Sequence, residues 1–435
     1  MMEVEARNTE STLIDLYSDL LSKDPLGGLR AQSKDLFLNL GLPHKKAEAY
    51  KYTPIKRLIE KNFDFTSISI PKTSWSKQSC EAKFYGNDQA NHLVFINGLF
   101  NEEYSKIASP SSDLKILTID SQSYQASEEI KSNLGKLIDE KNDVFAHLNT
   151  AAFNHGLFLH SFKNKDNLPT YIYHFNDGDT VNISMPRILT IVETGSRLRV
   201  YEKTFRNGDK NHLTNSLVES VVHTNGELRW TKLQNHTLND FAIEGFYGSQ
   251  NKDSRIYTNT FSFKAGLIRN NLGIDLNAEN CETHMHGLYY LNQSSHVDND
   301  TSVDHKLPNS FSNELYKGII DERAHAVFNG KIYVRPQAQK TNAFQSNNNI
   351  LLSDDAKVNT KPQLEIWADD VKCSHGCTTG QLDEEAIFYL RSRGISKQNA
   401  KALMLNAFAS ETLQEVTDEH IREEVENLIL NKLGV

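Results

Sequence analysis

The residues best suited to bind a metal lie together in the segment Cys373-Ser374-His375-Gly376-Cys377. Successive side chains of an extended strand point to opposite faces, so Cys373, His375 and Cys377 would share one face. Thiolate and imidazole are ligands that iron, zinc and iron–sulfur clusters accept. The spacing differs from the two-residue spacing of structural zinc knuckles, which disfavours a closed zinc site. On spacing alone, an inner strand face filled by two small apolar side chains and one hydrogen-bonded histidine is an equally good interpretation.

Two further groups of polar residues have the composition of a metal site. The pair His284 and His286 would share one strand face, but it lacks the glutamate and the glycine of a cupin-type motif. The second group is the segment HVDNDTSVDH, which contains His296, Asp298, Asp300, Asp304 and His305. Stacked polar side chains that hydrogen-bond around a turn are the simpler interpretation of both groups.

The motifs of several common enzyme classes are absent from the sequence. Gly135-Lys136 and Gly330-Lys331 are not followed by the hydroxyl residue of a P-loop, so we expect no ATP hydrolysis by such a loop. The chain also has no G-x-G-x-x-G, H-E-x-x-H or G-x-S-x-G motif. The sequence therefore predicts a protein without catalytic machinery of its own.

Composition indicates a folded chain that stays outside membranes. The 435 residues include 38% hydrophobic and 24% charged residues, and the net charge of −9 argues against a nucleic-acid partner. No apolar run approaches the roughly 18 residues that span a membrane, and the acidic start lacks the apolar segment of a signal peptide. We therefore expect a cytoplasmic protein whose cysteines, Cys80, Cys281, Cys373 and Cys377, are reduced thiols.

Short strand-like runs dominate the middle of the chain. RILTIVE (187–193), KIYV (331–334) and QLEIW (363–367) are separated by clusters of Asn, Asp, Gly and Ser. Many short strands without intervening helices predict a sandwich, a barrel or a β-solenoid. Consecutive asparagines in SNNNILLSDD (346–355) are typical of tight corners, because asparagine tolerates a left-handed backbone.

Helical periodicity marks the two ends of the chain. It is present in residues 11–62 and returns after Gly380. Asp383 and Ser396 are the predicted N-caps of two C-terminal helices, and a third is expected from about Asp418 onward.

The segment 314–395 closely resembles the SufB/SufD family of iron–sulfur cluster assembly scaffolds. Within it, DDVKCSHG (369–376), GQLDEE (380–385) and FYLRSRGI (388–395) are more similar to the SufD branch than to the SufB branch. Weaker similarities extend over most of the chain, in YKYT (50–53), FING (95–98), FAHLNTAAF (145–153) and PRILTIVE (186–193).

The resemblance implies a mainly β fold. The expected core is a right-handed parallel β-helix at residues 126–380, between a mostly helical N-terminal region (1–125) and a C-terminal helical region (381–435). The resemblance also implies a complex with a SufB-like scaffold and a SufC-like ATPase, the ATPase docking on the C-terminal helices. It implies no tightly bound cofactor for the chain alone, only a transient iron or iron–sulfur cluster in the complex.

Cys373 and His375 match family positions at the interface of the SufB-like and SufD-like chains, where nascent clusters form. The resemblance thus implies that both residues hold metal shared with the partner chain. Cys377 stands where alanine is common in the family, and it is a candidate additional ligand. His296, Asp298 and His305 match a recurrent family pattern, but we assign them no metal role.

Two other functions remain open at this point. One is a SufB-like core scaffold that accepts sulfur itself. The other is a β-helix enzyme acting on polysaccharides, in which Asp298, Asp300 and Asp304 would bind metal or transfer protons. Exposed strand edges further predict that the isolated chain forms a weak homodimer.

Overall fold

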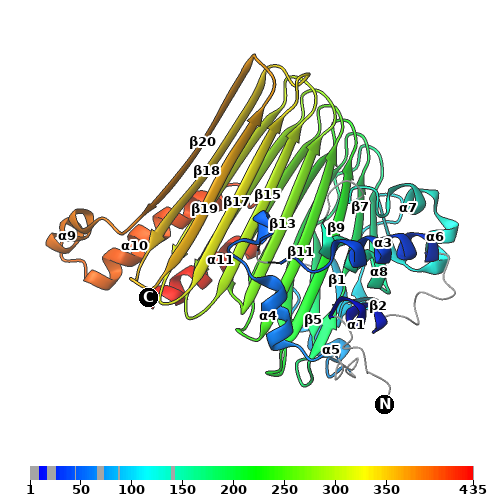
Figure 1. The fold of residues 1–435 in the computed structure, drawn as a ribbon, viewed down its shortest axis with the longest axis horizontal. Coiled ribbons are helices and arrows are strands. Elements are labelled where there is room, and N and C mark those ends of the chain that lie inside the picture. The colour runs from blue at the N-terminus through cyan, green and yellow to red at the C-terminus, as the bar shows by residue number, and fades with distance from the viewer. Residues whose placement is uncertain are drawn as a thin grey trace.

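Two long parallel sheets, built by one chain that passes alternately between them, form the body of the molecule (Figure 1). The computed structural model describes residues 9–16, 26–44, 46–65, 73–86, 89–138 and 143–434. Neighbouring strands of each sheet are parallel, except that β1 pairs with β2 and β3 with β4 in antiparallel fashion. The expected mainly β fold, a parallel β-helix with helices mostly at its two ends, is confirmed.

The first sheet follows the spatial order β2-β1-β5-β8-β10-β12-β14-β16-β18-β20. Its strands are β1 (Asn91–Ile96), β2 (Leu99–Lys106), β5 (Thr170–Asn176), β8 (Arg197–Arg206), β10 (Glu227–Asn235), β12 (Arg255–Lys264), β14 (Glu282–Leu291), β16 (Phe311–Ile320), β18 (Thr341–Leu351) and β20 (Val371–Gly380).

The second sheet follows the order β19-β17-β15-β13-β11-β9-β7-β4-β3, and β6 pairs with β9 beside this path. Its strands are β3 (Leu114–Ile119), β4 (Gly156–Ser161), β6 (Asn182–Ser184), β7 (Arg187–Val192), β9 (His212–Val222), β11 (Asp240–Gln250), β13 (Leu267–Leu276), β15 (His296–His305), β17 (His325–Val334) and β19 (Lys357–Ile366).

Most of the helices pack against the outer faces of the two sheets. Those of the N-terminal part are α1 (Thr9–Asp15), α3 (Gly27–Leu40), η1 (Glu48–Tyr50), α4 (Ile55–Asn62), α5 (Lys77–Glu81), α6 (Ser121–Ala126), α7 (Glu128–Asn133) and α8 (Val144–Ala152). The C-terminal helices are α9 (Glu384–Ser392), α10 (Lys397–Ser410), η2 (Glu411–Leu413) and α11 (Glu419–Leu433). In the part of the chain that the structure describes, no helix is both long and apolar enough to cross a membrane.

The predicted helix caps of the C-terminal region are confirmed. The Asp383 side chain accepts hydrogen bonds from the Glu385 and Ala386 amides, and that of Ser396 accepts from the Asn399 amide. Asp418 caps α11. In the N-terminal region the expected helices are accompanied by β1, β2 and β3, which extend both sheets.

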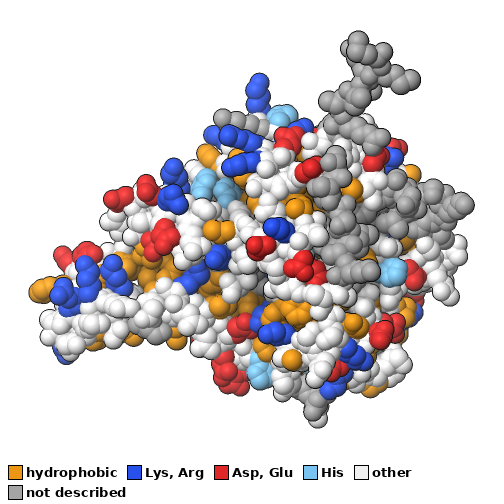
Figure 2. All heavy atoms as spheres, turned by 90° about the horizontal axis from the view of Figure 1, so that it is seen from below, with side chains coloured by type: hydrophobic (Ala, Val, Ile, Leu, Met, Phe, Trp, Pro, Cys, Tyr) orange, Lys and Arg blue, Asp and Glu red, His pale blue; other side chains and the backbone are white. Residues whose placement is uncertain are grey.

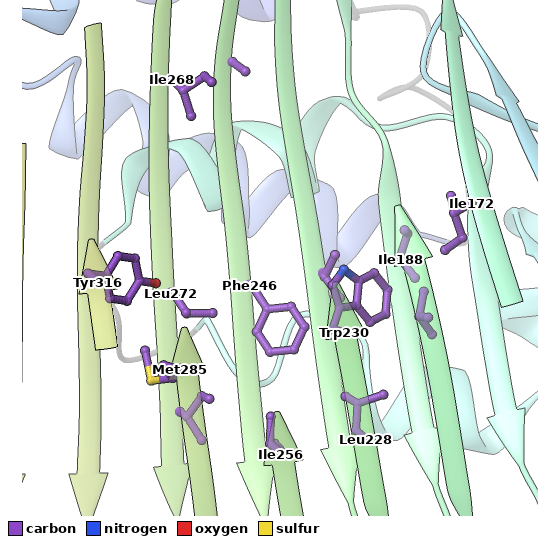
Figure 3. Packing of buried hydrophobic residues seen from close by; sticks show 14 of the residues in the cluster. Ile172, Ile188, Leu228, Trp230, Phe246, Ile256, Ile268, Leu272, Met285 and Tyr316 are labelled. Carbon is purple, nitrogen blue, oxygen red and sulfur yellow. The ribbon is translucent and has the colours of Figure 1, made fainter. Parts of the chain in front are cut away.

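Side chains alternate between the interior of the β-helix and its outer surface, as period-two strands require. Trp230, Phe246, Leu272 and Tyr316 meet between the two sheets and belong to one continuous apolar core (Figure 3). Trp230 and Phe246 pack edge to face, with ring centroids 5.6 Å apart. We call the interior enclosed by the two sheets the lumen.

The prediction that residues 346–355 form a tight corner is wrong for most of that segment, because residues up to Leu351 belong to β18. Lumen hydrogen bonds hold these asparagines in the strand: Asn347 Nδ2 donates to Tyr289 Oη (2.8 Å), and Asn349 Nδ2 donates to Asn347 Oδ1 (2.9 Å). Left-handed asparagines do form corners elsewhere, at Asn225, Asn280 and Asn309.

Candidate functional site

The Cys-x-His-x-Cys segment lies on β20, the last strand of the first sheet. β20 is hydrogen-bonded to β18 on one side, and no strand of the described chain pairs with its other side. Most of its residues are exposed to solvent, including His375 and Cys377, whereas Cys373 is half-buried. This end of the β-helix is therefore open, and we call the unpaired side of β20 the open edge (Figure 1).

The register of β20 places the three candidate ligands on its lumen side. Cys373 is paired with Ala343, His375 with Gln345 and Cys377 with Asn347. All three partners on β18 are buried in the lumen, and side chains in register on parallel strands point the same way. The alternation expected from the sequence thus brings Cys373, His375 and Cys377 onto one face.

The backbone hydrogen bonds show which residues of β20 face the open edge. The Asn342 amide donates to the Ser310 carbonyl on the β16 side, so the backbone groups of Ala343 face β20. The carbonyl of Thr378 accepts from Asn349 Nδ2 of β18 (3.4 Å). Even-numbered residues of β20 therefore direct their amides and carbonyls to β18. Those of the odd-numbered residues face the open edge, where a further strand could pair with them.

The four cysteines are free thiols in two different environments. Cys80 and Cys281 are buried in the core, and burial raises the pKa of Cys80 to about 11. Partial burial also raises the pKa of Cys373, while a hydrogen bond with the backbone of Ala343 lowers it. Cys373 is thus mainly a thiol in the isolated chain, and a bound metal cation would favour its deprotonation.

Large apolar side chains are also exposed at the open end, and the sequence pattern did not predict their position. Trp367 follows β19 and is 49% exposed, and Phe344 on the outer face of β18 is 38% exposed. The Arg335 guanidinium lies 5.2 Å from the Trp367 ring centroid and donates to both carboxylate oxygens of Asp304 (2.9 and 2.8 Å). Apolar and aromatic groups beside an unpaired strand edge are typical of a surface that another chain covers.

The structure divides the HVDNDTSVDH group, which runs along β15 and not around a turn. Asp298, Asp300 and Asp304 lie on the outer face, where Arg269 or Arg335 pairs with each of them. The side chain of His305 points into the lumen instead, with Nε2 2.8 Å from Ser312 Oγ.

His284 and His286 do share one face, the outer face of β14, with ring centroids 6.2 Å apart. His284 Nε2 lies 2.8 Å from Glu282 Oε1. His286 is buried, and burial lowers its pKa to about 4. Among the residues whose placement is described, no group of three or more His, Cys, Asp or Glu side chains is arranged to hold a metal.

Comparison with known proteins identifies related chains over almost the whole length. Residues 8–167 match the family described as the SufBD protein N-terminal region, and residues 174–408 match "SUF system FeS cluster assembly, SufBD core domain". The chain is 32% identical to a SufBD family protein of Synechocystis, over 89% of this chain and 86% of the relative. It is also 32% identical to the iron–sulfur cluster assembly protein SufD of Escherichia coli, over 89% of this chain and 88% of that protein. A chloroplastic protein of Arabidopsis thaliana is 25% identical over 96% of this chain and 88% of its own.

Proposed function

The chain belongs to the SufBD family of iron–sulfur cluster assembly proteins, and we propose that it is the SufD-like scaffold subunit of such a system. In this proposal a SufB-like chain pairs with the open edge of β20. Cys373 and His375 then contribute ligands to a cluster that is assembled between the two chains and passed on.

The observation that carries the proposal is the position of the candidate ligands on a strand with one unpaired edge. The side chains of Cys373 and His375 lie on the lumen face of β20. Their backbone amides and carbonyls face the open edge. A second β-helix docked on this edge would satisfy the backbone groups and enclose the thiol and imidazole in the same step. Both kinds of ligand suit iron and iron–sulfur clusters.

The proposal assigns no catalytic step to this chain. ATP hydrolysis would be supplied by a SufC-like partner that docks on the C-terminal helices, where Phe388 and Tyr389 of α9 are 71% and 57% exposed. The segment with α9 projects from the β-helix, and its tip carries apolar side chains among charged ones (Figures 1 and 2). Because thiol ligands must stay reduced, the proposal also places the chain in a reducing compartment such as the cytoplasm.

The environment of Asp298, Asp300 and Asp304 argues against the alternative of an enzyme acting on polysaccharides. Asp298 and Asp300 both pair with the buried Arg269, at 2.6 and 2.5 Å, and Asp304 pairs with Arg335. Carboxylates neutralised in this way are held in structural ion pairs and are not presented to a substrate. Similarity to SufD likewise favours the SufD-like over the SufB-like interpretation.

The proposal is tested by co-expressing the chain with the SufB-like and SufC-like proteins of the same genome and purifying the complex without oxygen. Iron and acid-labile sulfide per complex are then measured. Cys373→Ala and His375→Ala should keep the complex intact and lower both contents several-fold, whereas Cys377→Ala should leave them nearly unchanged.

Ser374→Ala is the matched control, because Ser374 is exposed on the same strand but its side chain lies on the outer face. Equal iron and sulfide contents in the His375→Ala, Cys373→Ala and Ser374→Ala complexes would refute the ligand assignment. A chain that binds neither co-expressed protein would refute the scaffold role.

A further inference from the structure

A column of polar side chains leads from the open end into the lumen. In register, His375 of β20 lies next to Gln345 of β18, which lies next to Glu314 of β16. Adjacent strands are about 4.8 Å apart, so the Gln345 side chain occupies the layer directly beneath His375. Gln345 and Glu314 are 3% and 0% exposed, while His375 is open to solvent.

Within this column, the described side-chain hydrogen bonds of Gln345 and Glu314 join them to residues deeper in the lumen and not to His375. Gln345 Nε2 donates to Glu314 Oε2 over 2.6 Å, and Thr301 Oγ1 donates to the same oxygen over 3.2 Å. Gly330 of β17 makes room for the amide, since a Cβ there would stand 2.2 Å from Gln345 Nε2. The Gln345 amide is thus fixed by its nitrogen to the layer below.

The oxygen of that amide, Gln345 Oε1, is buried. Among the described residues, no donor forms a hydrogen bond with it. A buried carbonyl oxygen without a donor is unfavourable, so the arrangement favours a donor that arrives from the adjacent layer. Side chains in register on adjacent parallel strands lie in layers about 4.8 Å apart, so a reoriented His375 imidazole can approach this oxygen.

Resting on the proposed function, we propose that Gln345, anchored by Glu314, is the positioning residue of His375. When His375 holds the metal, Gln345 Oε1 would accept the N–H of one ring nitrogen, which would fix the tautomer and turn the other nitrogen toward the metal. A histidine that binds a metal usually donates its second ring N–H to a carboxylate or a carbonyl, and here an amide backed by a carboxylate takes that role.

The test measures binding of Co²⁺ alone, without oxygen, to the complex of the chain with its SufB-like partner, followed by the thiolate-to-cobalt absorption band. Gln345→Met, which keeps the volume and removes the acceptor, should weaken Co²⁺ affinity about tenfold, the lower end for loss of such a support. In a His375→Ala background the same substitution should have no further effect. Glu314→Met, which removes the anchor, should also weaken binding.

Exchanging the two side chains separates positioning from packing. In the double variant Glu314→Gln with Gln345→Glu, an amide again donates to a carboxylate, and the carboxylate introduced at position 345 still offers an oxygen to His375. This variant should recover affinity to within about threefold of the unaltered chain, as expected when a positioning hydrogen bond is restored. Thermal unfolding of every variant shows which of them fold.

The outcomes are distinguishable. If His375→Ala weakens Co²⁺ binding but Gln345→Met and Glu314→Met do not, or if Gln345→Met acts equally without His375, the positioning role is refuted and the proposed function stands. If His375→Ala itself leaves binding unchanged, the assignment of His375 as a ligand fails, and the inference fails with it.

Discussion

Arg269 and Asp298 form a buried ion pair on the outer face of the second sheet, with Nη1 2.6 Å from Oδ2. The same guanidinium donates to the Ala49 carbonyl (3.0 Å), and the Thr53 hydroxyl donates to the carboxylate of Asp298. Two segments with family-like sequences, YKYT and HVDND, therefore meet at one place although they lie far apart in the chain. Their common role is to fasten the N-terminal segment to the β-helix.

Asp298→Ala should therefore destabilise the fold without affecting metal binding. Among the described residues, it leaves Asp300 as the one ion-pair partner of the buried Arg269, and loss of one member of a buried ion pair costs about 3 kcal/mol or more. Chemical unfolding measures the change. Asp304→Ala on the same face is the control, because its partner Arg335 is 41% exposed and such pairs contribute about 1 kcal/mol or less. Equal losses in the two variants would contradict the fastening role.

Strand alternation is sufficient to predict that Cys373, His375 and Cys377 share a face, because the direction of side chains along one strand depends only on local backbone geometry. Helix caps such as Asp383 and Ser396 were predictable for the same reason. The pairing of His375 with Gln345 and Glu314 was not, since it depends on the register between strands that are distant in the sequence. The predicted corner near Asn347 was wrong for a similar reason, because hydrogen bonds of the asparagine side chains in the lumen stabilise the strand.

Buried histidines should make the fold sensitive to acid. Burial lowers the pKa of His305 to about 3, well below the value of about 6.5 in an unfolded chain. The folded state then binds fewer protons than the unfolded state below pH 6.5, so stability is present above that pH and is lost as the pH falls. The free energy of unfolding should fall less steeply between pH 6 and pH 4 in His305→Gln than in the unaltered protein. The two slopes should differ by up to about 1.4 kcal/mol per pH unit. The difference between the two proteins at pH 7.5 gives the packing cost, and an unchanged slope would rule out the titration of His305.

Glu314 should have the opposite pH dependence. Burial raises its pKa to about 7, although Gln345 and Thr301 donate to it, so the folded state holds a proton that the unfolded state releases near pH 4.5. The stability that this proton contributes is present below pH 4.5 and is lost as the pH rises through 7. Glu314→Gln, which removes the titration, should therefore stabilise the fold by about 2–3 kcal/mol at pH 8 relative to its effect at pH 4.5. Denaturant unfolding at the two pH values checks this, and an effect that does not vary with pH would refute it.

The exposed face of α9 should carry the contact with the ATPase partner. Phe388→Asp places a charge in that face and should reduce co-purification of the ATPase at least tenfold, with little change in thermal stability, because Phe388 is 71% exposed. Leu38→Asp on α3, where Leu38 is 40% exposed, is the control. A point substitution is more informative than removal of the region after Gly380, because Val425 of α11 is buried against the first sheet. If the Phe388 variant binds the ATPase as well as the unaltered chain does, α9 does not carry the contact.

Two neighbouring threonines of β20 offer a direct test of pairing at the open edge. The amide of Thr379 faces the open edge and that of Thr378 faces β18, as the hydrogen bonds of β18 and β20 indicate. Proline removes the amide donor, so Thr379→Pro deletes a donor that no strand of the described chain uses, whereas Thr378→Pro deletes one used in pairing with β18. Thr379→Pro should therefore weaken binding of the SufB-like partner with little change in melting temperature, and Thr378→Pro should lower the melting temperature more. For each purified variant, calorimetric titration with the partner measures the affinity, and thermal unfolding measures the melting temperature. If the two variants bind the partner with the affinity of the unaltered chain, the partner does not extend the sheet at β20, and the shared site must form through side-chain contacts alone.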